Sequence, residues 1–434
     1  LTRSKSAAPN TASLSGRRRG SVHADSRQNH WVSNSDAGAR SPFNGAATNA
    51  GVNQGATTKS TRSSDTDGGS MSGRDTSVKA AASDAAGGSA AGSQVFAVTG
   101  ATGFLGSHLL QQLLAAGHTV RCLCRQPNAL PPHPNIQVVL GPLEDPSALD
   151  SLLQGSSGLF HLAGIVTHSR AATSSPQPNS SPQPTIAQTT IDGTLAILHA
   201  ASKAGVNRVV YASTSGTVGA SRDPGQVASD DSPYAMGVVG GWPYYRAKIE
   251  AEERARAYAE GLGMELMCMR PTLILGPGDY RLSSCRTVLD IMERRIPFVP
   301  PGGLSFVDVR DVATAFIAAM QSAPPSSTYL LGAVNMTLSD YFQLIARYAD
   351  VAPPWLSVPP RVAWVLAAAA SKLLPLIGRK DPSLDPVVVE MAQIFWYIDW
   401  SRAEKELGFS PRPYEETVAD TVVWLREHRR ELSG

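Results

Sequence analysis

The chain has 434 residues, and its 38 Lys and Arg against 36 Asp and Glu give a formal net charge of +2. This near balance gives no support for nucleic acid as a partner. The four cysteines lack the spacing of a zinc site and do not read as a disulfide framework, so a reducing compartment is expected and no metal site is predicted. No apolar run is long enough to predict a transmembrane helix.

Residues 1–93 differ from the rest of the chain in composition. They are rich in Ser, Ala, Gly, Thr and Asn, contain no Glu, and carry scattered basic residues such as Arg17, Arg18 and Arg19. Apolar side chains are too sparse there to offset the entropy of ordering, which predicts a disordered segment. A Ser-rich, Arg-bearing, acid-poor segment is typical of a transit peptide. We therefore expect a chloroplast or another organelle, and otherwise a cytoplasmic protein with a disordered extension.

A glycine-rich turn follows the first apolar run of the remaining chain. Residues 95–98 read as a buried strand, and residues 109–116 have helical apolar spacing that ends at Gly117. Between them, Gly100 permits a tight turn, Gly103 lets the backbone approach phosphate oxygens, and Gly106 permits close packing of helix on strand. The positive end of the helix dipole then faces the anion. The order strand, glycine turn, helix predicts a dinucleotide site.

Apolar strands then alternate with helical patterns. Further strands are expected at residues 118–124, 136–140, 159–163 and 208–212, and helices at residues 147–153 and 194–204. Near-continuous apolar strands that alternate with helices predict an α/β fold with a doubly wound parallel sheet. We expect a dinucleotide-binding domain over 94–271, with a flexible Ser/Pro/Gln insertion at 173–188, and a smaller, mostly helical substrate lobe over 272–434. Within that lobe, residues 305–333 are expected to return to the core of the first domain.

The end of the second predicted strand bears on the choice of cofactor. Sites for NAD usually place Asp or Glu there to hold the ribose 2′-hydroxyl. This chain has Cys124 followed by Arg125. A guanidinium suits a 2′-phosphate, which predicts NADP(H) over NAD(H); the alternative is that Arg125 is a solvated loop residue.

Two later stretches carry candidate chemistry. Ser213, Thr214 and Ser215 follow the strand at 208–212, and ligands bind at such strand ends. Tyr244 and Lys248 are four residues apart on a predicted helix and share one face. A nearby ammonium is expected to lower the tyrosine pKa and to make proton transfer feasible. Taken alone, Tyr-x-x-x-Lys is more often a surface pair.

Together, these motifs resemble the extended short-chain dehydrogenase/reductase superfamily. Within it the chain is similar to the NAD-dependent epimerase/dehydratase family, and to its dihydroflavonol 4-reductase-like branch with hopanoid-associated sugar epimerase homologues. Later stretches carry the same resemblance: Arg270-Pro271-Thr272, Gly276-Pro277-Gly278-Asp279, and residues 306–313 and 403–413. The resemblance implies a Rossmann-type sheet with a smaller C-terminal lobe.

The resemblance also implies roles for individual residues. The catalytic set would be Thr214, with Ser213 and Ser215 as alternatives, Tyr244 and Lys248. The implied cofactor contacts are Gly100, Thr102, Gly103, Phe104, Leu105, Gly106, Arg125, Leu143, Ala163, Lys248 and Pro271.

The expected function is NADPH-dependent reduction of a small carbonyl substrate, with Tyr244 as the proton donor. The alternatives are a nucleotide-sugar epimerase or dehydratase and a non-catalytic NADP-binding scaffold. A homodimer is a further possibility that the superfamily implies. Candidates to line the substrate site are Tyr280, Arg281, Trp355, Trp396 and Tyr397.

Overall fold

A computed structural model describes residues 92–164, 186–296, 298–324, 327–357 and 386–432. Nearly all of the expected transit segment (1–93) and most of the expected insertion (173–188) lie outside the described residues. In the described part of the chain, no helix is both long and apolar enough to cross a membrane.

A seven-stranded sheet organises the described residues. Its order is β10-β6-β5-β4-β1-β2-β3, and every neighbouring pair is parallel. The strands are β1 (Val95–Thr99), β2 (Thr119–Cys124), β3 (Ile136–Leu140), β4 (Gly158–His161), β5 (Arg208–Ala212), β6 (Glu265–Pro271) and β10 (Thr328–Leu331). The predicted α/β class and doubly wound parallel sheet are confirmed.

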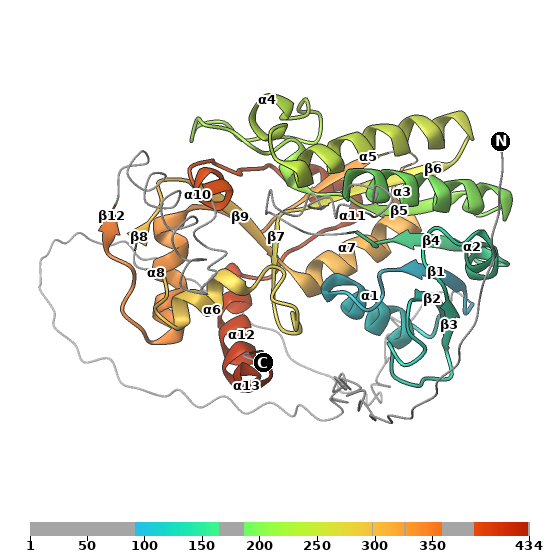
Figure 1. Ribbon diagram of the computed structural model, residues 1–434, viewed down its shortest axis with the longest axis horizontal. Coiled ribbons are helices and arrows are strands. Elements are labelled where there is room, and N and C mark those ends of the chain that lie inside the picture. The colour runs from blue at the N-terminus through green and yellow to red at the C-terminus, as the bar shows by residue number, and fades with distance from the viewer. Residues whose placement is uncertain (1–91, 165–185, 297, 325–326, 358–385, 433–434) are drawn as a thin grey trace, which may run out of the picture. The chain divides into compact units, whose positions relative to one another are not determined.

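Helices cover both faces of this sheet (Figure 1). On one face lie α2 (Pro146–Leu153), α3 (Ile186–Lys203) and α5 (Pro243–Gly261), and on the other lie α1 (Phe104–Ala115) and α7 (Val309–Ser322). Local sequence sets where helices begin: Asp145 caps α2 by accepting from Ser147 N at 2.9 Å, and Pro146 occupies its first turn. Leucines of α2 and alanines of α3 and α5 then form one apolar cluster with β4, β5 and β6.

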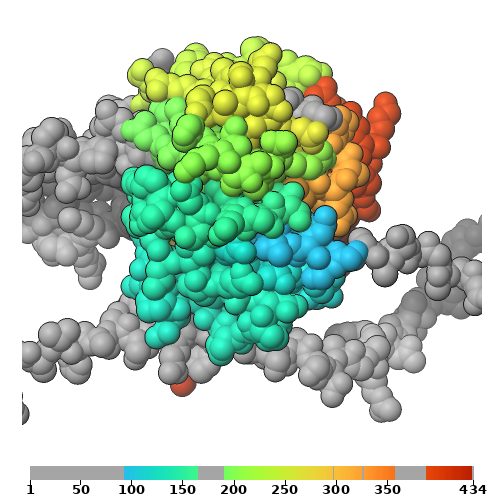
Figure 2. Space-filling model, turned by 90° about the vertical axis from the view of Figure 1, so that its right-hand side faces the viewer, coloured from blue at the N-terminus to red at the C-terminus, as the bar shows by residue number. Residues whose placement is uncertain are grey.

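The strand order reverses at β1. From β1 the chain adds β2 and β3 on one side and then crosses to β4, β5 and β6 on the other. Ligands bind at such a reversal, outside the carboxyl ends of the strands. Most of the face seen in Figure 2 is formed by the segment from β1 to α5, coloured blue to yellow, with orange and red C-terminal segments at its right edge.

The C-terminal part is helical, as predicted, and also contains two small sheets. An apolar cluster joins α6 (Arg286–Met292), α8 (Leu338–Ala349) and α12 (Tyr414–Glu427). Beside them, β7 (Leu273–Leu275), β9 (Gly303–Asp308) and β11 (Val334–Thr337) form a three-stranded sheet, and β8 (Phe298–Val299) pairs with β12 (Leu356–Ser357). Within residues 305–333, β10 joins the large sheet, whereas β9 belongs to the three-stranded one.

The remaining elements are short. A 3₁₀ turn, η2 (Ser215–Thr217), and α4 (Met236–Val239) lie between β5 and α5. Near the end of the chain are α10 (Pro386–Met391), α11 (Ser401–Leu407) and α13 (Arg429–Leu432).

Candidate functional site

The three glycines form a corner that a larger residue would disrupt. Gly100 has φ +80°, and a Cβ there would lie 2.8 Å from the backbone N of Ala163. A Cβ on Gly106 would lie 2.1 Å from Gly100 O, and one on Gly103 would lie 3.2 Å from the same oxygen. The corner closes through a 2.9 Å hydrogen bond from Gly103 N to Gly100 O. Each glycine therefore meets a steric demand of the turn.

The corner leads directly into α1. Phe104 and Leu105 are the first two residues of this helix, and Thr102 lies in the turn before it. Gly103 is the N-cap and has no side chain with which to cap the first-turn N–H groups. These groups and the helix dipole fit a diphosphate.

Other predicted cofactor contacts follow the carboxyl ends of neighbouring strands. Arg125 is exposed directly after β2, and Leu143 lies after β3. Ala163 lies after β4, where its N donates to Thr99 Oγ1 at 3.2 Å, and Pro271 is the buried last residue of β6. Because all these strands are parallel, their ends lie at one edge of the sheet.

A neutral hydrogen-bond chain lies buried at the ends of β1 and β4. His161 Nδ1 is 2.7 Å from Thr99 Oγ1, and His161 Nε2 is 3.2 Å from Thr194 Oγ1. The Thr194 hydroxyl donates to Thr190 O at 2.8 Å. Burial, together with the nearby Lys248, lowers the pKa of His161 to about 3. The ring is therefore neutral.

The helix that carries the Tyr-x-x-x-Lys motif is attached to the end of β5. Lys248 is buried on α5, and its Nζ donates to Ala212 O at 3.0 Å. The same Nζ lies 5.5 Å from the centre of the Tyr211 ring. Burial lowers the pKa of Lys248 to about 8, while Glu252 acts in the opposite direction.

Tyr244 lies in the first turn of α5, partly buried against the edge of the Tyr245 ring, with the ring centres 5.0 Å apart. Burial raises the pKa of Tyr244 to about 12. The sequence-based expectation of a lowered tyrosine pKa is therefore wrong for this structure, because desolvation of the phenolate dominates.

The hydroxyl groups after β5 differ in what they contact. Ser213 Oγ donates to Glu252 Oε2 and so faces the interior. Ser215 is buried as the first residue of η2. Thr214 is partly exposed, and its Oγ1 accepts from Gly216 N at 3.3 Å, which uses a lone pair and not the hydroxyl proton. Of the three, Thr214 is the best placed to donate to a substrate.

A buried ion pair lies behind these hydroxyls. Arg270 of β6 and Glu252 of α5 form a salt bridge in which their side chains are 2% and 0% exposed. The Tyr234 hydroxyl donates to Glu252 Oε1 at 3.1 Å, and Arg270 Nη1 donates to Asp230 O at 3.2 Å. The pair therefore has polar partners on several sides, as a buried charge requires.

The predicted lining residues do not lie together. Trp396 is stacked on Tyr245, with ring centres 5.1 Å apart, and belongs to the same aromatic cluster as Tyr244. Tyr280 instead contacts Trp424, and Arg281 beside it is exposed. Of the last two, Trp355 is 86% exposed, and Tyr397 lies against Phe395. Of these five residues, only Trp396 is placed near Tyr244 by the contacts described.

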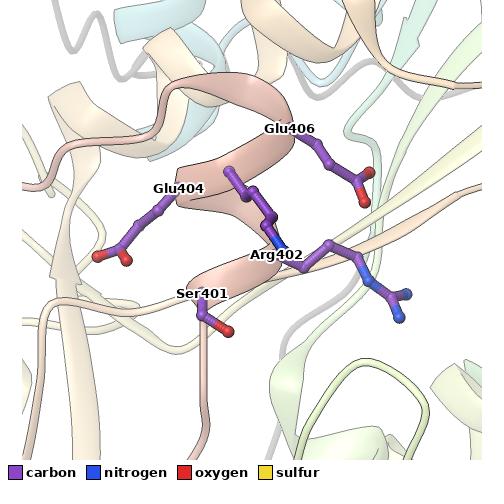
Figure 3. A pocket seen from close by; sticks show the side chains of 5 residues that line it. Ser401, Arg402, Glu404 and Glu406 are labelled. Carbon is purple, nitrogen blue, oxygen red and sulfur yellow. The ribbon is translucent and has the colours of Figure 1, made fainter.

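One surface pocket lies on α11 (Figure 3). Its lining residues are Ser401, Arg402, Glu404, Lys405 and Glu406, all from this one helix. None of them is a predicted site residue.

Three buried residues near the lysine helix or its partners were not predicted from the sequence. Glu252 is one helical turn beyond the lysine, a spacing that places it on the same face. Arg270 stands in the Arg-Pro-Thr stretch, and His161 is a polar residue inside an otherwise apolar strand. A charged or polar residue in an apolar strand is the signal that could have identified both.

Comparison with known proteins agrees with this architecture. The profile of the NAD dependent epimerase/dehydratase family matches residues 96–332. A putative dihydroflavonol 4-reductase of Synechocystis sp. is 31% identical over 346 residues, covering 77% of this chain and 95% of that protein. Sterol demethylase protein B of Methylococcus capsulatus is 29% identical over 334 residues, covering 76% and 98%.

Among solved structures, gox2253 superposes with a TM-score of 0.64 at 28% identity, over 78% of this chain and 99% of that one. The expected superfamily is thereby confirmed. The chain belongs to the NAD-dependent epimerase/dehydratase family and is an NAD(P)-dependent oxidoreductase of the extended short-chain dehydrogenase/reductase type.

Proposed function

We propose that the protein reduces a small carbonyl compound with NADPH, with Tyr244 as the proton donor. The observation that carries the proposal is the 3.0 Å hydrogen bond from Lys248 Nζ to Ala212 O. This bond holds the helix of Tyr244 against the end of β5, two residues before Thr214. A phenol, an ammonium and a hydroxyl are the groups that a carbonyl reductase of this superfamily needs.

The residues at the sheet edge fit a dinucleotide. The glycine corner and the first turn of α1 would hold the diphosphate, Arg125 a 2′-phosphate, and Lys248 the nicotinamide ribose. Leu143, Ala163 and Pro271 would contact the rest of the cofactor along the same edge. When bound, the reduced nicotinamide supplies the hydride.

The raised pKa of Tyr244 suits the reductive direction. With its pKa raised by burial to about 12, the phenol keeps its proton at neutral pH. An alkoxide that develops on the substrate is a stronger base than a phenolate and can take that proton. Thr214 would donate a hydrogen bond to the same oxygen and stabilise its growing charge.

A titration of the full chain with NADPH and NADH tests the cofactor assignment. Arg125→Ala is expected to weaken NADPH binding by roughly 10- to 100-fold and to leave NADH binding unchanged, because one charge-assisted contact is lost. Arg347→Ala, which removes an exposed arginine of α8, is the control. Equal NADPH affinities in wild type and Arg125→Ala would remove Arg125 from the 2′ site.

Turnover with a panel of aldehydes and ketones tests the chemistry. Tyr244→Phe is expected to lower carbonyl-dependent NADPH oxidation by about 100-fold or more. Tyr245→Phe is the matched control, because this neighbouring tyrosine is buried in the aromatic cluster, whereas Tyr244 is only partly buried against it. Full activity in Tyr244→Phe would contradict the proposed proton donor.

A second candidate is a nucleotide-sugar epimerase or dehydratase. It is supported by the name of the family whose profile matches the chain. Such an enzyme would use the same residues but restore its cofactor within each turnover. Conversion of a nucleotide sugar without net NADPH consumption would favour it, and cofactor binding without any turnover would favour a scaffold.

A further inference from the structure

We propose that Glu252 is a positioning residue, whose buried carboxylate fixes the hydroxyl segment at the end of β5 and the lysine of α5 relative to β6. The inference rests on the proposed function of Thr214, Tyr244 and Lys248. Glu252 itself is not among the residues expected to contact cofactor or substrate.

The contacts of Glu252 come from three separate segments. From the end of β5, Ser213 Oγ donates to Oε2. From β6, Arg270 Nε donates to Oε1 at 3.1 Å, and Nη2 of the same guanidinium also bonds this oxygen. From the segment before α4, the Tyr234 hydroxyl donates to Oε1 at 3.1 Å. Both carboxylate oxygens therefore have donors.

Two of these three contacts lie next to a proposed site residue. Ser213 directly precedes Thr214, and Arg270 directly precedes Pro271. On α5, Glu252 follows Lys248 by one helical turn. One carboxylate thus joins the ends of β5 and β6 to the helix that carries Tyr244. Because it is completely buried, movement of any of these segments would leave a polar atom without a partner, which is costly.

The carboxylate also acts on Lys248 through its charge. The groups near the ammonium are Glu252 from α5, His161 from β4, and Tyr211 and Ala212 O from β5. Burial lowers the pKa of Lys248 to about 8, and Glu252 opposes that change. Without the carboxylate charge, the lysine would lose its proton at a lower pH, while the uncompensated Arg270 would add repulsion.

A purely structural ion pair makes different predictions from a positioning residue. Loss of a structural pair lowers the melting temperature and leaves the rate and pH dependence of the folded enzyme unchanged. Loss of a positioning residue changes kcat more than KM. It also moves the alkaline limb, the pH range in which NADPH binding weakens because Lys248 loses its proton. The two roles can therefore be separated in one set of variants.

The test uses the full chain, NADPH as the binding probe, and a carbonyl substrate found in the panel. NADPH binding to the wild type is expected to weaken above about pH 8, where Lys248 loses its proton. Glu252→Gln is expected to move this alkaline limb down by about one unit. It is also expected to lower kcat by roughly 10- to 100-fold with a smaller change in KM. Glu252→Asp, which keeps the charge but is shorter, should restore the limb and not kcat.

Two further variants keep the test decisive. Ser213→Ala removes only the contact with the hydroxyl segment and should lower kcat about 10-fold without moving the limb. Glu250→Gln is the matched control, since this residue pairs with Arg246 on the outer part of the same helix, and it should change neither. If Glu252→Gln does not fold, Ser213→Ala decides.

Unchanged kcat and an unchanged limb in folded Glu252→Gln, or unchanged kcat in Ser213→Ala, would overturn the proposal. Failure of the proposed reductase function is distinguishable: the wild type would then turn over no carbonyl, or Tyr244→Phe would equal it. In that case the NADPH-binding limb still tests the effect of Glu252 on Lys248.

Discussion

Two buried polar groups lie at the same edge of the sheet, on either side of Lys248, and only one of them is charged. At the ends of β1 and β4, Thr99, His161 and Thr194 form the neutral chain. Near the ends of β5 and β6, Glu252 and Arg270 form the ion pair. Both groups are almost completely buried.

The two groups show two ways of burying polar atoms beside the candidate site without a net charge. In the neutral chain, Thr99 Oγ1 accepts from Ala163 N and Thr194 donates to Thr190 O. All of these hydrogen bonds are satisfied if His161 carries its proton on Nε2 and Thr99 donates to Nδ1. The ionic group instead cancels its charge internally. Neither therefore holds a net charge of its own beside Lys248.

The stability of the protein should depend more on the ion pair than on the neutral chain when one partner is removed. Arg270→Met leaves the Glu252 carboxylate buried and uncompensated, and we expect it to reduce the free energy of unfolding by about 3–5 kcal/mol. Urea denaturation measures this change. The double variant Arg270→Met, Glu252→Leu should recover much of the loss, because it removes both charges.

The matched control is Arg246→Met. Arg246 pairs with Glu250 on the same helix, but its side chain is 63% exposed, so the expected loss is below about 1 kcal/mol. Similar losses in Arg270→Met and Arg246→Met would break the distinction between a buried pair and a surface pair.

The glycine corner lies next to the neutral chain, because Gly100 directly follows Thr99. Gly106→Ala would place a Cβ 2.1 Å from Gly100 O, so α1 must move away from β1. We expect a loss of about 3 kcal/mol in unfolding free energy and weaker NADPH binding. Gly261→Ala is the control, because that helical position has open space around its Cβ. Unchanged NADPH affinity in Gly106→Ala would show that the corner is not the diphosphate site.

The sheet could be predicted from the spacing of apolar residues, because that spacing differs between buried strands and helices. Residues 95–98 and 136–140 were expected as strands, and β1 and β3 contain them. The glycine corner was predictable for a similar reason: its requirements are local, since Gly103 and Gly106 both meet the oxygen of Gly100.

The two buried polar groups were not predictable, because their partners are far apart in sequence. His161 meets Thr99 across 62 residues, and Ser213 meets Glu252 across 39. The prediction of a lowered pKa for Tyr244 was wrong for a related reason. Its sequence context shows a lysine four residues away but not the burial that dominates its ionisation.

The neutrality of His161 makes a prediction about acid stability. Its pKa is about 3 in the folded protein, whereas an unfolded chain binds the proton near pH 6.5. Between these values the unfolded state holds one more proton, so stability falls as pH falls, by at most about 1.4 kcal/mol per unit.

His161→Gln removes that titration, so its stability should fall less than that of the wild type on acidification. Urea denaturation measures the free energies of unfolding of wild type and variant. The difference between them is expected to be about 2 kcal/mol smaller at pH 5 than at pH 6.5. His133→Gln, which changes an exposed loop histidine, is the control. Parallel pH dependences in wild type and His161→Gln would mean that the buried ring is not held neutral.

The smallest expected effect tests the direction of the neutral chain. Thr194 and Thr421 are both buried helical threonines whose hydroxyls donate to the carbonyl four residues earlier, but only Thr194 also contacts His161. Replacing each by Val therefore removes the same local bond, and Thr194→Val additionally leaves His161 Nε2 without its acceptor. We expect Thr194→Val to be less stable than Thr421→Val by about 1 kcal/mol. Equal losses would argue that Nε2 carries no proton. His161 Nδ1 would then donate to Thr99 Oγ1, which already accepts from Ala163 N.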